Sequence, residues 1–371
     1  MKISLVRLTG FRNYTQESVS PGPGANLFLG RNGQGKTNLL EAMALLSTTR
    51  SPRTSRDTDL VGWDAEWASV SVEVDRERRN DLRLEVRIEA DGTKQVLINT
   101  VRHPRVVDLL GELNTTTFWV EDIEIVRGDP SVRRRFLNQE ISQRSPHYCH
   151  DLAYLRRVLE HRNRLLKQLH QRGSASDSLS VWDEQLVTHG SRIIEQRRAF
   201  VESLRAPANT YHQQLTEGDE ELDLLYQPSF ELAEGEGPEA RFYEALEAQR
   251  EAEIGRGVTL VGPHRDEVTF LINGRDARTF GSLGQQRSVS LSLKLAEMAS
   301  LEAELGEKAV LLMDDLFADL DRRRITALLK AALPGRQSFL VCTEPDLLPK
   351  EPIEGATWYR VDRGRVTAWK A

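Results

Sequence analysis

The feature of this chain that most constrains its fold is one glycine-rich segment, Gly30-Arg31-Asn32-Gly33-Gln34-Gly35-Lys36-Thr37. It matches the pattern G-x-x-x-x-G-K-[ST] at every fixed position. An apolar run at residues 25–29 precedes it, and a helical pattern at residues 37–46 follows it. This order lets backbone N–H groups and a helix N-terminus surround phosphates, so it predicts a nucleoside triphosphate site in an α/β domain. A glycine-rich surface turn, the alternative, would not need these neighbours.

A triphosphate bound at this pattern would also need ligands from a second segment further along the chain. Lys36 is expected to reach the β- and γ-phosphates of ATP, and the Thr37 hydroxyl is expected to ligate Mg²⁺. Residues 309–313 are apolar and end in Asp314 and Asp315. Ligands bind at the carboxyl ends of parallel strands, so Asp314 is expected to hold Mg²⁺ and Asp315 to polarise the attacking water. Helix or loop capping is the alternative for both.

A third candidate segment is Ser282-Leu283-Gly284-Gln285, which precedes a helical pattern over residues 284–305. Serine and glycine before a helix form an anion site of the kind that the first loop uses. One chain has no use for a second γ-phosphate site unless that site serves the nucleotide of another subunit. The alternative is an ordinary serine N-cap.

Length and composition restrict the class of protein. A chain of 371 residues suggests two domains or one domain with a large insertion. The net charge of −6 argues against a surface covered in DNA-binding charge, but residues 131–205 hold 14 Lys/Arg against 8 Asp/Glu, and residues 217–253 hold 13 Asp/Glu against 2 Arg. A solvated charged surface is the alternative to a polyanion site.

The two separated cysteines, and the lack of a long apolar stretch or a signal peptide, predict a cytoplasmic protein.

Hydrophobic periodicity predicts three segments. Residues 1–130 have strand patterns at 3–8, 26–29, 69–74, 82–89 and 95–99, typical of an antiparallel sheet attached to a nucleotide-binding core. Residues 131–256 have helical patterns at 151–171 and 181–204, joined by a Gly/Ser-rich turn at 173–180, and at 239–250. Residues 257–371 return to a β/α pattern: strands at 258–261, 267–272, 309–313 and 338–342, helices at 284–305 and 321–333, and hairpin turns at Asn273-Gly274 and at 362–364. The predicted fold is an α/β ATPase head with a mixed sheet, an antiparallel β subdomain and a helical insertion lobe.

The order of these motifs resembles the ATP-binding cassette (ABC) superfamily, with residues 317–321 similar to its D-loop. Within that superfamily the chain resembles the RecF family and its SMC-type relatives over nearly its whole length. The resemblance rests on Leu5, Leu8 and residues 11–14, on Glu121-Asp122-Ile123 with Val126, Gly128, Pro130 and Arg133-Arg134, on residues 162–167, and on Gly262-Pro263-His264-Arg265-Asp266.

The resemblance implies an ATP-dependent homodimer that binds ATP with Mg²⁺. Each nucleotide would lie between the first loop and Asp314 of one subunit and Ser282, Leu283, Gly284 and Gln285 of the other. Arg12 and Asn13 would lie near the nucleotide, Glu121 or Asp122 in the Q-loop, and Asp319 and Asp321 in the D-loop. The family binds double-stranded DNA and single-strand/double-strand junctions and hydrolyses ATP slowly. It acts in repair, replication restart and the SOS response with RecR and RecO, ahead of RecA.

The chain departs from the superfamily pattern at two catalytic positions. Asp315 stands where many cassette ATPases carry Glu, which favours a slow switch over a fast motor. Thr343 or Glu344 stands where transporters carry a switch His, so the γ-phosphate sensor stays open.

Two positively charged segments and two other protein classes complete the predictions. Arg133, Arg134 and Arg135, with His264 and Arg265, are candidates for contact with DNA or a partner; solvated or loop roles are the alternative. A membrane transporter's ATPase subunit would lack the basic helical arm. A small-molecule P-loop kinase would not need Ser282 to act in a second subunit.

Overall fold

The computed structural model describes residues 1–76, 79–172, 179–232, 235–349 and 351–369. It divides into two compact units. The head unit comprises Met1–Ile123, Thr210–Glu220 and Leu283–Ala371, and the helical unit comprises Glu124–Asn209 and Glu221–Ser282. Residues 257–282, predicted with the C-terminal half of the head, thus belong to the helical unit, and residues 210–220 belong to the head.

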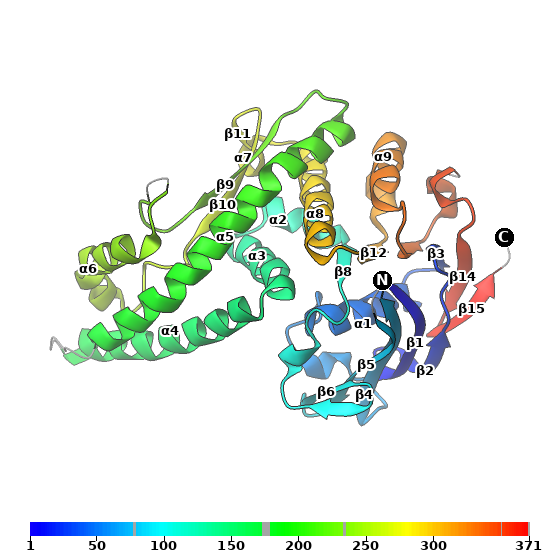
Figure 1. Cartoon of the computed structure of the whole chain (residues 1–371), viewed down its shortest axis with the longest axis horizontal. Coiled ribbons are helices and arrows are strands. Elements are labelled where there is room, and N and C mark those ends of the chain that lie inside the picture. The colour runs from blue at the N-terminus through cyan, green and yellow to red at the C-terminus, as the bar shows by residue number, and fades with distance from the viewer. Residues whose placement is uncertain (77–78, 173–178, 233–234, 350, 370–371) are drawn as a thin grey trace. The chain divides into compact units, whose positions relative to one another are not determined.

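The core sheet of the head unit positions the predicted site (Figure 1). Its strand order is β15 (Arg365–Trp369), β14 (Thr357–Asp362), β3 (Ala25–Leu29), β13 (Ser338–Cys342), β12 (Val310–Asp314) and β8 (Thr115–Phe118). All pairs are parallel except the β14–β15 hairpin. Every residue of β12 and β13 is buried, as expected for strands covered on both faces.

Strand β8 was not predicted from the sequence. Its segment Thr115-Thr116-Thr117-Phe118 is not an apolar run, yet all four residues are buried, because β8 pairs along β12 and both α1 and α8 pack against it. β-Branched threonine suits this extended backbone.

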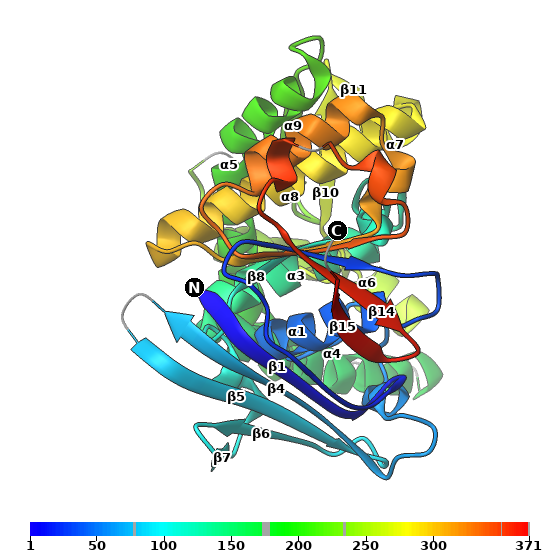
Figure 2. The same cartoon turned by 90° about the vertical axis from the view of Figure 1, so that its right-hand side faces the viewer.

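The predicted antiparallel sheet is confirmed. Its order is β2 (Tyr14–Val19), β1 (Lys2–Phe11), β4 (Trp67–Arg76), β5 (Arg79–Glu89), β6 (Lys94–Ile98) and β7 (Val101–His103). Helix α1 (Lys36–Thr48) follows the phosphate-binding segment and lies between the two sheets (Figure 2). The helix is apolar around most of its circumference because both sheets pack against it.

Two further helices cover the opposite face of the core sheet. These are α8 (Leu283–Leu305) and α9 (Arg322–Ala332). Leu295 of α8 and Leu328 of α9 belong to one buried cluster with Leu311 and Met313 of β12. No helix among the described residues is long and apolar enough to cross a membrane.

The helical unit contains the predicted hairpin, here α4 (Pro146–Arg172) and the greater part of α5 (Leu179–Thr216), together with α2 (Glu124–Arg127), α3 (Pro130–Arg144), α6 (Pro238–Arg256) and α7 (Ala277–Phe280). Most of the turn predicted at residues 173–180 lies outside the described residues. The three-stranded sheet of this unit has the order β11 (Arg275–Asp276), β10 (Glu267–Ile272) and β9 (Leu222–Gln227).

Two sequence predictions in this unit have different outcomes. The Asn273-Gly274 hairpin turn is confirmed, because both residues have positive φ, 49° and 75°, and Ile272 pairs with Arg275. The strand predicted at residues 258–261 is wrong: this segment is turn and irregular backbone, and Val258 N–H donates to the Glu253 carbonyl at the end of α6. Strand β9, within the acidic region, was missed.

Candidate nucleotide-binding site

The glycine-rich loop joins β3 to α1, as its sequence context predicts. Lys36 Nζ donates to the carbonyls of Gly30, at 2.6 Å, and Arg31, at 3.1 Å, so the ammonium group lies inside the curve of the loop. Burial lowers the pKa of Lys36, while the nearby carboxylates of Asp315 and Asp314 oppose this shift. A buried cation among backbone donors is the arrangement that binds phosphate oxygens.

Thr37 and Asp314 meet at the end of β12. Thr37 Oγ1 donates to Asp314 Oδ1 at 2.9 Å, although the residues are far apart in sequence. Burial, together with the neighbouring carboxylates of Asp315 and Glu121, raises the pKa of Asp314 to about 6. A hydroxyl and a desolvated carboxylate that converge on one point fit the oxygen ligands of Mg²⁺.

Asp315 follows Asp314 in the chain, and its carboxylate contacts Thr343. Its φ of 45° is left-handed. Its Oδ1 accepts hydrogen bonds from the backbone N–H and the hydroxyl of Thr343, each at 3.2 Å. The structure therefore brings Thr343, one of the two residues at the switch-histidine position, to the carboxylate predicted to act on water.

The loop is held by Asn13, which the family resemblance placed near the nucleotide, and by residues that the sequence patterns did not assign to it. Asn13 Nδ2 donates to the Gln34 carbonyl at 2.9 Å, and Tyr14 Oη donates to the Gly35 carbonyl at 2.9 Å. The β14–β15 turn also contacts the loop: Gly364 N–H donates to the Gln34 carbonyl, at 3.0 Å, and Arg363 N–H donates to the Gln34 side chain, at 2.8 Å. The turn was predicted as a hairpin, but no local signal indicates what it packs against.

Arg12 lies next to the loop with its guanidinium already bonded. It donates two hydrogen bonds to Glu41 of α1, at 2.9 and 2.7 Å, and one to the Asp59 carbonyl, at 2.8 Å. Beside it is a pocket of about 650 Å³ whose lining includes Asn13, Asn38 and the exposed Trp63. This pocket is adjacent to the first turn of α1, because Asn38 lines it.

The two candidates for the Q-loop have different environments. Both belong to a short 3₁₀ helix, Val120–Ile123, after β8. Glu121 is near enough to Asp314 to raise its pKa. Asp122 accepts a hydrogen bond from the Trp119 backbone N–H at 2.7 Å, which is a local turn contact. The geometry favours Glu121.

The signature segment spans the boundary between the units, because Ser282 ends the helical unit and Leu283 begins α8. Gln285 Nε2 donates to Glu220 Oε1 at 2.9 Å, and a Cβ atom on Gly284 would lie 3.5 Å from Arg324 Nη1. In the predicted D-loop, Asp321 caps α9 by accepting from the Arg324 N–H at 3.0 Å. The side chain of Asp319 lies outside the described residues.

The candidate DNA contacts in the helical unit are mostly committed to internal partners. Arg133 is buried, and two of its nitrogens donate to Glu267 at 2.6 and 2.7 Å, so its guanidinium is engaged inside the helical unit. Arg134 donates to the Asp266 carbonyl at 2.8 Å, and Arg265 to the Thr259 carbonyl at 3.0 Å. Burial lowers the pKa of His264 to about 4.

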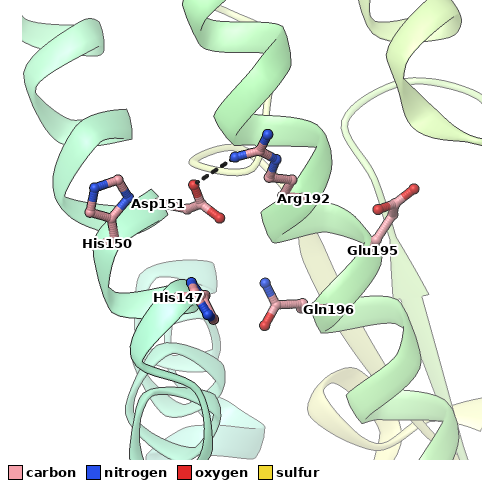
Figure 3. A pocket seen from close by; sticks show the side chains of 6 residues that line it. All are labelled: His147, His150, Asp151, Arg192, Glu195 and Gln196. Atoms are coloured by element: carbon pink, nitrogen blue, oxygen red, sulfur yellow. Dashed lines mark ion pairs between the residues drawn. The ribbon is translucent and has the colours of Figure 1, made fainter.

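The positive charge of residues 131–205 is likewise reduced by pairing. The buried guanidinium of Arg162 donates to Asp183 and Glu253, each at 2.7 Å. On the α4–α5 hairpin, Arg192 faces Asp151 at 3.7 Å in a pocket of about 430 Å³ (Figure 3), which is also lined by His147, His150, Glu195 and Gln196. Among the candidates, Arg135 and Arg265 are exposed.

The fold and the loop geometry define a nucleotide-binding head of the ABC type. The family described as RecF/RecN/SMC N terminal domain matches residues 2–351. The DNA replication and repair protein RecF of Geobacillus kaustophilus (strain HTA426) is 40% identical over 373 residues, which cover 99% of this chain and 100% of the relative. The chain belongs to the RecF family of DNA replication and repair proteins.

Solved structures agree with this assignment. A structure of the recombination mediator protein RecF with ATP, in the RecFOR pathway, has a TM-score of 0.91 and 34% identity, and the match covers 99% of this chain and 97% of that chain. A second structure, RecF-ATPrS, has a TM-score of 0.91 and 33% identity, and the match covers 100% of this chain and 98% of that chain. An Smc head domain from Pyrococcus furiosus has a TM-score of 0.58 at 15% identity, covering 99% and 96%, and shares the fold.

Proposed function

We propose that this chain is an ATP-gated DNA-binding protein of recombinational repair, in which ATP joins two copies into a dimer. The observation that carries the proposal is the Thr37–Asp314 contact, which assembles a phosphate and Mg²⁺ half-site in the head. The relatives solved as RecF-ATP and RecF-ATPrS support nucleotide binding at this fold. Family membership disfavours the transporter and kinase alternatives.

Each residue of the half-site has a distinct role in this proposal. Lys36 exchanges its carbonyl partners for the β- and γ-phosphates, while Thr37 and Asp314 hold Mg²⁺. Bound Mg²⁺ supplies charge neutralisation between the β- and γ-phosphates. Asp315, held by Thr343, orients the attacking water. The shorter Asp side chain is consistent with slow hydrolysis that resets a switch.

The second half of each composite site would come from the other copy. Gly284 lies against Arg324 and Gln285 is bonded to Glu220, whereas the nucleotide half-site is built around Thr37 and Asp314. These contacts form two separately built half-sites on one chain. A dimer in which Ser282 and Gly284 of one copy bind the γ-phosphate held by the other uses both.

The dimer would bind double-stranded DNA and single-strand/double-strand junctions, with RecR and RecO as partners before RecA. The RecF family membership and the RecFOR pathway named for the solved relatives support this part of the proposal. The exposed Arg135 and Arg265 are the remaining candidates from the sequence for contact with DNA phosphates.

Light scattering with and without ATP tests the dimer. Wild type should double its mass at saturating ATP, while Lys36→Arg and Ser282→Arg should stay monomeric. Ser18→Arg is the matched control, because it places the same bulk and charge on an exposed serine of β2. A wild type that stays monomeric, or a Ser282→Arg variant that dimerises like Ser18→Arg, would contradict the proposal.

A further inference from the structure

The carboxylate of Glu220 makes two hydrogen bonds at the start of α8. Oε1 accepts from Gln285 Nε2 and Oε2 lies against His212 Nε2, each at 2.9 Å. The Glu220 side chain is 18% exposed and that of His212 is fully buried. Glu220 lies four residues after Thr216, the last residue of α5, within the head unit. Both carboxylate oxygens are therefore engaged in one partly dehydrated contact.

The second bond extends the contact along α8. His212 Nδ1 lies 3.3 Å from Ser292 Oγ, and Ser292 Oγ donates to the Ser288 carbonyl at 2.6 Å. Gln285 and Ser292 are seven residues apart, which is about two turns of helix. Glu220 thus holds α8 at Gln285 directly and at Ser292 through His212. Two points two turns apart fix both the position of the helix along its axis and its rotation.

The charges around this contact are consistent with a neutral ring. Burial lowers the pKa of His212, whereas the hydrogen bond that the ring donates to the Glu220 carboxylate opposes that shift and the guanidinium of Arg324 adds to it. In its Nε2–H tautomer the neutral imidazole donates to Glu220 Oε2 and holds the carboxylate in place. The contact therefore depends on hydrogen-bond geometry more than on a full ion pair.

We propose that Glu220 is a positioning residue for the signature segment. It holds the first turn of α8 in the register that presents Gly284 and Gln285 to the nucleotide of a second copy. This inference rests on the proposed function, because a signature that acts across the dimer needs a defined orientation before the second copy arrives. Preorganisation of this kind lowers the cost of ordering the helix end during association.

The contact gives one residue of the acidic segment 217–253 a structural role that a count of its charges does not predict. Glu220 is one of 13 acidic residues among residues 217–253. Its neighbours Asp219 and Glu221 are exposed, so the pattern of the sequence does not distinguish them. Glu220 is the residue of these three whose carboxylate reaches α8.

Three variants separate positioning from stability. Glu220→Ala removes both bonds. Glu220→Gln keeps an oxygen that accepts from Gln285. Its new N–H group can donate to Nε2 of His212 when the neutral ring takes the other tautomer, in which Nδ1 donates to Ser292 Oγ. Glu221→Ala is the matched control, since it removes an exposed carboxylate at the next position.

The readouts are the midpoint of ATP-dependent dimerisation by light scattering, the affinity of the monomer for a fluorescent ATP analogue, and the melting temperature. Glu220→Ala should weaken dimerisation by roughly tenfold or more, as expected for the loss of a hydrogen bond to a charged group, and leave nucleotide affinity within about twofold. Glu220→Gln should retain dimerisation within about threefold of wild type, and Glu221→Ala should match wild type. Equal dimerisation of Glu220→Ala and Glu221→Ala, or a parallel loss of nucleotide affinity and melting temperature, would overturn the inference.

Hydrogen exchange of the monomer provides a readout that does not need the dimer. Glu220→Ala should speed amide exchange at residues 283–288, while Glu220→Gln and Glu221→Ala preserve the wild-type rates. Unchanged exchange in Glu220→Ala overturns the positioning role. If wild type itself fails to dimerise while this exchange pattern appears, the proposed function fails and the contact between Glu220 and α8 stands.

Discussion

At the scale of single residues, Asp314 illustrates a conflict between binding and stability. Its pKa is raised to about 6 by burial, above the usual value of 3.8. Between these two values the folded state binds a proton that the unfolded state releases, so this carboxyl group costs folding free energy as the pH rises through about 6. The cost is offset when a cation binds.

Asp314→Asn should therefore stabilise the nucleotide-free protein, and more at pH 7.5 than at pH 5. The same variant should lose Mg²⁺-dependent ATP hydrolysis. Melting curves of both proteins at the two pH values, with EDTA present, measure the first effect. A gain in melting temperature that is larger at pH 5 than at pH 7.5 would contradict the assignment of the buried charge.

Arg133 and Arg135 form a matched pair on one turn of α3. Arg133→Ala leaves Glu267 without its buried partner and should destabilise the helical unit by about 3 kcal/mol. Arg135→Ala should leave stability unchanged and, if Arg135 neutralises one DNA phosphate, lower the slope of log affinity against log salt by about one. Denaturant unfolding and DNA binding at several salt concentrations test both. A loss of stability in Arg135→Ala, together with unchanged stability in Arg133→Ala, would contradict these roles.

At the scale of elements, the β14–β15 turn supports the nucleotide loop from the far end of the chain. Gly364 has a φ of 71°, and a Cβ atom there would lie 2.3 Å from the Asn13 carbonyl oxygen. Gly364→Ala should therefore displace the turn from Gln34 and lower ATP affinity by roughly tenfold, with part of the effect from backbone strain. Gly274→Ala is the control: its φ is 75° in another hairpin, where a Cβ meets nothing within 4 Å. Equal ATP affinities of the two variants would show that the turn does not support the loop.

The elements also show how far sequence reasoning reaches. The loop, α1 and β12 were predictable because each has a local pattern, and Lys36, Thr37 and Asp314 meet as their motifs require. Strand β8 was missed because its threonines are buried by tertiary packing, with α1 and α8 against it and β12 beside it. The burial of Arg133 could not be predicted because a linear count of charges does not reveal that Glu267 pairs with it.

At the scale of the whole molecule, the proposed dimer contains two half-sites on each chain, and each half-site completes the site of the other chain. Each half-site has its own supports: Asn13, Tyr14 and the β14–β15 turn hold the glycine-rich loop, and Glu220 with Arg324 contacts the signature segment. Separate supports make sense if each half must be preorganised before the other copy arrives. They also allow each half to be disabled without the other.

Mixing two disabled variants tests this claim most directly. Lys36→Ala should lose nucleotide binding and Ser282→Arg should lose the signature contact, so each alone should show almost no ATP turnover. In an equimolar mixture, the mixed dimer pairs the intact loop of Ser282→Arg with the intact signature of Lys36→Ala. Turnover should then rise well above the sum of the two variants alone. A mixture no more active than that sum would contradict a signature segment that acts on the nucleotide of the second copy.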